Sequence, residues 1–149
     1  MFKRILVPVD GTEATEQVVH AGIELARQLQ ASITCFLTEP ALPSELTPHG
    51  GFPAVEDAVE HAPEMLARAH QLLRQFEDRA RANGVACSAV IEQGSRSDKA
   101  LMAAAEACGC DLMLMVSTGR GAFGEALFGS QTKSVLAGCR LPMLLLLPQ

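Results

Sequence analysis

Short apolar runs alternate with helix-like segments along the whole chain of 149 residues, and this alternation limits the fold more than any single motif does. Strands separated by single helices pair in parallel with right-handed crossovers. We therefore predict one α/β domain over residues 1–149, built on an open five-stranded parallel sheet. The expected strands lie at about 2–9, 31–38, 85–94, 111–117 and 141–149, and the expected helices at about 13–30, 63–82, 97–109 and 130–138.

The residue types within these segments indicate how they pack. The runs at 112–116 and 143–147 are apolar without alternation, which is typical of strands that helices cover on both faces of a sheet. In the first helix, two overlapping sets recur at helical spacing on the expected inward side: Val19, Ile23, Ala26 and Gln30, and Gly22, Ala26 and Leu29. Small residues on that side would let the helix lie close to the sheet.

The long second helix has an expected inward face that includes Leu72 and Phe76, and Asn83-Gly84 supplies its end. Before it, residues 38–63 contain five prolines and a Gly-Gly pair, so we expect a long loop there. Loops of this length within a compact domain are often functional. We interpret this one as a lid beside the end of the second strand.

Composition excludes several classes of protein. The chain is 48% hydrophobic and 19% charged, as expected of a soluble globular protein. Its net charge of −5 argues against a nucleic-acid-binding surface, which would be basic. No apolar run approaches the roughly 20 residues of a membrane span, and the start lacks the apolar core of a signal peptide. We expect a cytoplasmic protein with neither nucleic-acid nor membrane partners.

The cysteines and histidines indicate no metal site. Five scattered cysteines without a signal peptide are expected to be reduced thiols. Cys108-Gly-Cys110 lacks zinc-finger spacing, and we interpret it as two small buried residues at a helix end and its following turn. No arrangement of a nucleophile with a base is recognisable either, so the sequence does not predict a conventional hydrolase.

A glycine-rich segment after the fourth strand contains a literal G-x-G-x-x-G pattern at Gly119, Gly121 and Gly124. In a dinucleotide-binding fold, this pattern opens a helix, and an acidic residue follows at the end of the next strand. Here no helix opens at once, the next strand has no acid, and only one strand remains. The interpretation as a nicotinamide-dependent enzyme is therefore weak.

The same segment is suited to holding an anion. Glycines allow close backbone approach, and successive backbone N–H groups can form a concavity for a phosphate. Gly129-Ser130 lies where the next helix begins, so the helix dipole favours negative charge at the same place. The alternative is that the glycines only shape a loop and Ser130 only caps the helix. The residues alone leave both interpretations open.

At both ends the chain resembles the universal stress protein family. The similarity is carried by "ILVPVDGTEATEQVVHAGIELA" at 5–26 and by "DLMLMVSTGRGAFGEALFGSQTKSVLAGCRLPMLLL" at 111–146. ATP-binding members carry the motif G-x2-G-x9-G-[ST]. Gly119, Gly129 and Ser130 match this motif, but Val116 stands where the family has its first glycine. The resemblance implies a strand order of 3-2-1-4-5, in which strands 1 and 4 meet at the topological switch point where ligands bind.

The resemblance also implies an ATP site, with or without Mg²⁺. Asp10 would hydrogen-bond the adenine, next to Pro8 and Val9, and Leu37 or Thr38 would meet the base through backbone groups. Alternatively, Asp10 only caps the helix or completes a turn with Gly11. The ribose and phosphates would be surrounded by Gly119, Arg120, Gly129, Ser130, Gln131 and Thr132.

The resemblance further implies a homodimer that pairs through residues 141–147, the expected edge strand. We expect a regulatory module that binds ATP, and we keep as alternatives a homodimer from the family branch that binds no nucleotide and a slow ATP hydrolase. Val116 favours weaker binding, because a β-branched residue disfavours positive φ and its methyl groups occupy space beside the ligand.

Overall fold

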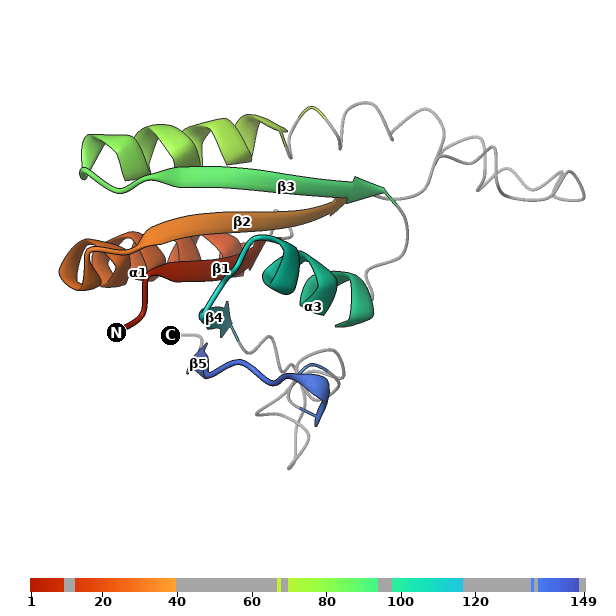
Figure 1. Cartoon of the computed structure of the whole chain (residues 1–149). Helices are drawn as coiled ribbons and strands as arrows, with labels where there is room; N and C mark the ends of the chain where they lie inside the picture. Colours follow the sequence, from red (N-terminus) through yellow and green to blue (C-terminus); the bar gives the residue numbers. More distant parts are fainter. Residues whose placement is uncertain are drawn as a thin grey trace, which may run out of the picture.

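The structure is a computed structural model that describes residues 1–9, 13–39, 67, 70–93, 98–116, 135 and 137–147. Its five strands form one parallel sheet in the order β3-β2-β1-β4-β5, as predicted (Figure 1). The strands are β1 (Arg4–Val9), β2 (Ser32–Glu39), β3 (Cys87–Gln93), β4 (Leu112–Val116) and β5 (Met143–Leu146). The longer helices among the described residues are α1 (Glu13–Leu29), α3 (Asp98–Ala107) and a helix over residues 70–82; residues 67, 135 and 137–138 are also helical.

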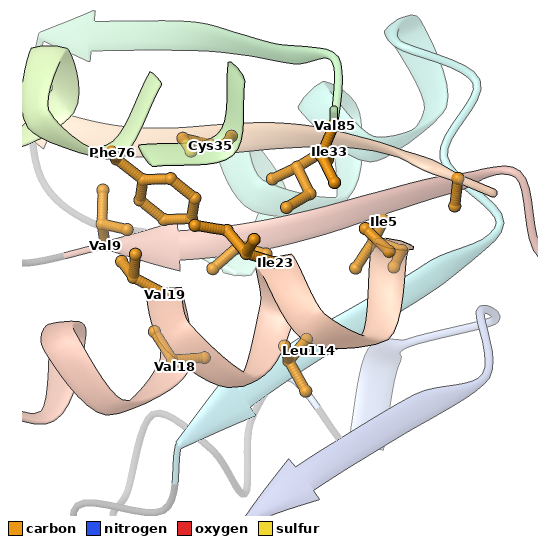
Figure 2. Packing of buried hydrophobic residues seen from close by; sticks show 14 of the residues in the cluster. Ile5, Val9, Val18, Val19, Ile23, Ile33, Cys35, Phe76, Val85 and Leu114 are labelled. Atoms are coloured by element: carbon orange, nitrogen blue, oxygen red, sulfur yellow. The ribbon is translucent and has the colours of Figure 1, made fainter. Parts of the chain in front are cut away.

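Two apolar clusters fill the two sides of the sheet. The first, here called the α1-side cluster, joins β1 residues such as Ile5 to α1 and to the helix over 70–82; Figure 2 shows Phe76 pointing toward Ile23. The second, here called the α3-side cluster, includes Leu6 and Leu101. Because Ile5 and Leu6 are both fully buried on opposite faces, helices cover both faces of the sheet, as predicted.

The first helix lies close to the sheet at Gly22. A Cβ atom added there would lie 3.3 Å from a methyl group of Leu114 and 3.6 Å from a methyl group of Val7. The predicted close approach through small residues is therefore confirmed. The helix packs directly over the seam between β1 and β4, the strands that carry Val7 and Leu114.

These three helices end in the same way. After α1, the Ala31 N–H donates to the carbonyl of Ala26, and Gln30 between them has a φ of 53°. The same bond pattern follows the helix over 70–82 and α3, where Gly84 and Gly109 take the left-handed position. Gln30 is thus exposed at the helix end, and the prediction that it lies on the inward face is wrong, because the helix stops at Leu29.

The helix over residues 70–82 ends at Asn83-Gly84 as predicted, and Phe76 faces inward as predicted, but Leu73 takes the buried position that was predicted for Leu72. Leu73, Phe76 and Ala80 are buried, whereas Leu72 is half-buried. Both Leu72 and Leu73 are compatible with the helical period that places Phe76 inward. The choice between them depends on how the helix is rotated against α1 and β2, which the sequence pattern did not specify.

A carboxylate joins the amino ends of β1 and β4. Asp111 accepts hydrogen bonds from the backbone N–H groups of Lys3, at 2.8 Å, and Arg4, at 2.9 Å. The Asp111 N–H donates in turn to the carbonyl of Arg4, and the Arg4 guanidinium donates to the carbonyl of Cys108. We call this group of bonds the Asp111 clasp.

All five cysteines are free thiols, as predicted. Cys108 is half-buried and Cys110 is buried in the α3-side cluster, with Gly109 at φ 64° between them. The interpretation of this triplet as a helix end and turn is therefore confirmed. Among the described residues, no group of three or more His, Cys, Asp or Glu side chains could hold a metal ion.

Candidate functional site

The carboxyl ends of β1 and β4 meet at the topological switch point of the sheet. From β1 the chain crosses to β2 on one side, and β4 lies on the other side (Figure 1). Helices that leave such a pair of strands toward opposite faces open a crevice between them, and ligands bind there in open α/β sheets. β1 ends at Val9 and β4 ends at Val116, so these two residues border the candidate site.

The seam between β1 and β4 is paired over a short length only. The β1–β2 ladder runs the whole length of β1, from Arg4 opposite Ser32 to Val9 opposite Leu37. Between the described residues of β1 and β4, the ladder holds two pairs, Ile5 with Leu112 and Leu6 with Met113. Within these residues, hydrogen-bonded pairing on the β4 side therefore stops well before the carboxyl end of β1.

Pro8 explains where this ladder stops. Along a strand, successive residues direct their N–H and C=O groups alternately toward the two neighbouring strands. The Lys3 carbonyl accepts a hydrogen bond from the N–H of Ser32, the first residue of β2. The Arg4 carbonyl accepts one from the N–H of Asp111, the residue directly before β4. Position 8 has the parity of Arg4 and faces β4. Proline has no N–H, so the next bond of the β1–β4 ladder is missing at Pro8.

Val116 occupies an ordinary strand conformation. It is the last residue of β4, it pairs with Leu146, and its half-buried side chain packs against the α1-side cluster. Among the described non-glycine residues, positive φ occurs at Gln30 alone. The prediction that positive φ disfavours valine at position 116 is therefore wrong, because the strand continues through this position. The prediction that the methyl groups of Val116 occupy space beside the ligand remains untested by the described residues.

The end of β2 carries two residues of the predicted site, Leu37 and Thr38. Leu37 is 4% exposed, and its side chain belongs to the α1-side cluster. Thr38 pairs with Glu92 of β3 through the backbone ladder. The contact between the adenine base and the backbone at Leu37 or Thr38, which the family resemblance implies, stays a prediction.

The structure brings together the described part of the predicted site: Pro8 and Val9 lie beside Leu37 in the β1–β2 ladder, and Val116 ends the next strand. The remaining predicted residues lie outside the described residues: Asp10, Gly119, Arg120, Gly129, Ser130, Gln131 and Thr132. Of these, Asp10 directly follows β1, and Gly119 comes three residues after β4. Most of the predicted loop at 38–63 also lies outside the described residues.

A comparison with family models matches residues 1–146 to the model described as "Universal stress protein family". The chain belongs to the universal stress protein family. The match spans nearly the whole chain and includes both ends of the sequence on which the resemblance was based. None of the curated proteins compared with the chain matches it significantly.

Solved structures of other universal stress proteins share the fold. UspA from Lactobacillus plantarum has a TM-score of 0.75 at 20% identity, with 97% of each chain covered. A universal stress protein in complex with cAMP has a TM-score of 0.69 at 20% identity, again with 97% of each chain covered. One from Archaeoglobus fulgidus in complex with dAMP has a TM-score of 0.63 at 16% identity and the same coverage.

The described residues of this universal stress protein also form two surface grooves. One, of about 470 Å³, is lined by α1 residues that include Glu16 and His20 and by Leu146 and Leu147. The other, of about 430 Å³, lies at the amino end of the sheet and includes Lys3. No described helix is long and apolar enough to cross a membrane.

The sequence did not reveal one pair of chemically reactive side chains. Cys35 of β2 and Cys87 of β3 have their sulfur atoms 3.6 Å apart. They are 52 residues apart in the sequence, and their proximity depends on the register between two strands. A longer alternation of apolar and polar residues in either strand would have indicated that Cys35 and Cys87 lie on the same face of the sheet. The register between the two strands, however, cannot be read from the sequence.

Proposed function

We propose that this universal stress protein binds an adenine nucleotide, ATP with or without Mg²⁺, at the carboxyl ends of β1 and β4. It would act in the cytoplasm as a regulatory homodimer in the stress response, through conformation and partners rather than turnover. The observation that carries the proposal is the short β1–β4 ladder, which stops where Pro8 faces β4. Solved structures of two proteins of the same fold are complexes with adenine nucleotides, cAMP and dAMP, which supports the choice of ligand.

The roles of individual residues follow the sequence prediction. Asp10 would bind the adenine beside Pro8 and Val9, and the backbone at Leu37 or Thr38 would contact the base. The phosphates and ribose would lie against Gly119, Arg120, Gly129, Ser130, Gln131 and Thr132. Backbone N–H groups at a helix start attract phosphate without requiring a basic protein, so the net charge of −5 does not oppose this proposal.

Titration calorimetry with Mg-ATP, AMP and cAMP tests the proposal. We expect saturable binding that Asp10→Ala and Ser130→Ala both weaken. Glu106→Ala is the matched control, since Glu106 is exposed near the carboxyl end of α3, away from the site, and should bind as the wild type does. Equal binding by the wild type, Asp10→Ala and Ser130→Ala would contradict the assigned residues.

A proline substitution tests the observation on the ladder directly. Pro8→Val restores an N–H that faces β4, so one more bond of the β1–β4 ladder can form at the carboxyl end of β1. We expect weaker nucleotide binding with unchanged or higher thermal stability. Pro142→Val, at the amino end of β5, is the matched control and should leave affinity unchanged.

A homodimer of the branch that binds no nucleotide is the second candidate, and Val116 is the residue that favours it. Removing its methyl groups in Val116→Gly should tighten ATP binding about tenfold, or about 1.4 kcal/mol, if they crowd the ligand. Absence of binding at millimolar ATP in both the wild type and Val116→Gly would establish the second candidate. Submicromolar binding by the wild type would instead contradict the crowding by Val116.

The proposed homodimer would pair through the edge strand β5. Leu144 is 42% exposed and Leu147 is 59% exposed, whereas the half-buried Leu145 packs against the α3-side cluster of its own chain. An apolar edge strand with unpaired backbone groups favours association. We expect a dimer by light scattering at micromolar concentration. Leu144→Lys with Leu147→Lys should weaken it, and Ile91→Lys, on the opposite edge strand β3, should not.

A further inference from the structure

We propose that Cys35 and Cys87 form a site of reversible oxidation, in which a peroxide converts the two thiols into a disulfide between β2 and β3. The inference is independent of nucleotide binding. It rests on the arrangement of two thiols in neighbouring strands, on the difference in their burial, and on the lack of a third metal-binding group beside them among the described residues.

The geometry brings the two sulfur atoms into contact. In the β2–β3 ladder, Cys87 pairs with Ile33 and Cys35 pairs with Ala89, so the cysteines are diagonal neighbours. Both belong to or pack against the α1-side cluster, which includes Phe76; Figure 2 shows Cys35 and Phe76 in this cluster. Their sulfurs are 3.6 Å apart and share a thiol hydrogen bond. A disulfide would require the sulfurs to approach by about 1.5 Å, to the usual bond length of about 2.05 Å. Because the two residues are offset along neighbouring strands, their Cα atoms lie roughly 8 Å apart, so bond formation also requires the backbone of the exposed edge strand β3 to shift toward β2 by about 1 Å.

The two thiols have different environments, which assigns their roles. Cys35 is fully buried, whereas Cys87 is half-buried at the first position of β3. The hydrogen bond shared with Cys35 lowers the pKa of Cys87, against the opposing effects of burial and of the Glu77 carboxylate. The hydrogen bond and burial raise the pKa of Cys35. Cys87 is therefore the thiol that reacts first, since the thiolate is the nucleophile.

The reaction balances with one peroxide for each pair. The Cys87 thiolate attacks a peroxide oxygen, the O–O bond breaks, and a sulfenic acid forms while the leaving hydroxide takes up a proton as water. The sulfur of Cys35 then loses its proton and attacks the sulfur of Cys87. The S–O bond breaks, and the departing oxygen leaves as a second water. The sulfurs supply two electrons to the peroxide, and a dithiol reductant reverses the change.

Other uses of this pair fit less well. Within the part of the chain that the structure describes, no third His, Cys, Asp or Glu side chain completes a metal site with them. Cys108, Cys110 and Cys139 belong to or pack against the α3-side cluster, on the opposite face of the sheet from Cys35. The disulfide would connect β2 to β3 across 52 residues of chain and so fix the pairing of these two strands.

Peptide mapping tests the proposal on the full chain. The reduced protein is treated with a small excess of hydrogen peroxide, free thiols are alkylated, and the protein is digested without reductant. We expect a peptide pair linked through Cys35 and Cys87 that lacks two hydrogen atoms and disappears after dithiothreitol. Cys139→Ser, a matched loss of one half-buried thiol from the other face, should leave the linked pair unchanged.

A variant gives a second test. In Cys35→Ser, the sulfenic acid on Cys87 has no neighbouring thiol to react with, so a dimedone probe should label it much more strongly than in the wild type. Equal dimedone labelling, or absence of the linked peptides, would overturn the proposal.

Discussion

The Asp111 clasp gives a sharp test of what holds β1 and β4 together. Its carboxylate accepts two backbone hydrogen bonds, at 2.8 Å from Lys3 and 2.9 Å from Arg4. Such bonds to a charged group contribute about 1.5–3 kcal/mol where water is excluded. Lys3 and Arg4 are exposed, so water can replace part of each bond, and we reduce the figure to about 1 kcal/mol per bond.

The two bonds predict graded effects of substitution. Asp111→Ala removes both acceptors and should lower the free energy of unfolding by about 2 kcal/mol at pH 7. Asp111→Asn keeps one carbonyl oxygen and should lose about half of that. Nucleotide binding should not change in either variant, because Asp111 lies at the amino end of β4 and the candidate site lies at its carboxyl end.

The pH dependence identifies the charge as the cause. Partial burial acts to raise the pKa of Asp111, but the backbone hydrogen bonds from Arg4 and Lys3 outweigh it and hold the pKa below its usual value. A group whose pKa is depressed on folding contributes stability above its unfolded pKa of about 3.9, and this stability is lost as the pH falls through the folded value. The amide that Asp111→Asn introduces cannot titrate in this range.

Urea denaturation of the wild type and Asp111→Asn at a series of pH values measures this contribution. The difference between the two free energies of unfolding should be constant above about pH 5 and should shrink below about pH 4. The contributions of the other carboxylates to the pH dependence cancel in this difference, because those groups titrate in both proteins. A difference that is absent at pH 7, or that stays the same from pH 7 to pH 3, would refute the assignment of the clasp to a charged acceptor.

Two further predictions concern the packing and the end of α1. Gly22→Leu should lower the free energy of unfolding by about 3 kcal/mol or prevent folding, since a Cβ atom alone would lie 3.3 Å from Leu114. Gly138→Leu is the control, because a Cβ atom at Gly138 would have nothing within 4 Å. Equal melting temperatures of the two variants would contradict the close approach at Gly22. Gln30→Gly should raise the free energy of unfolding by about 0.5–1 kcal/mol, because glycine adopts the φ of 53° without strain. Gln30→Ala should give no such gain in the same urea titration, and a gain as large as that of glycine would indicate another cause.

Most of the fold could be predicted from local patterns, because each strand and helix carries its own signal. The apolar runs at 112–116 and 143–147 identified β4 and β5, and Asn83-Gly84 identified a helix end. The strand order came from the family resemblance, since pairing between distant strands has no local signal. The errors at Gln30 and Leu72 have the same origin. Periodicity predicts which residues of a helix share a face, but the neighbouring elements decide where the helix ends and how it is rotated against the sheet.

The candidate site was predictable in part, for a related reason. The ends of β1, β2 and β4 meet because parallel strands share one direction, so Val9, Leu37 and Val116 could be assigned to one edge. The backbone conformation of Val116 could not be inferred from the motif. The glycine that other family members carry at this position could adopt a positive φ, but that does not tell which φ a valine adopts there. The pair Cys35–Cys87 was missed because a register between strands decides it.

The seam between β1 and β4 is held at one end and unpaired at the other. At the amino end, Asp111 supplies acceptors for the N–H groups of Lys3 and Arg4. Four residues beyond Arg4, Pro8 faces the same neighbour without an N–H, and the ladder has already stopped at Leu6. Because the two features lie at opposite ends of one short strand, stability and ligand access are separable. Asp111→Ala should change unfolding without changing binding, and Pro8→Val should change binding without lowering stability.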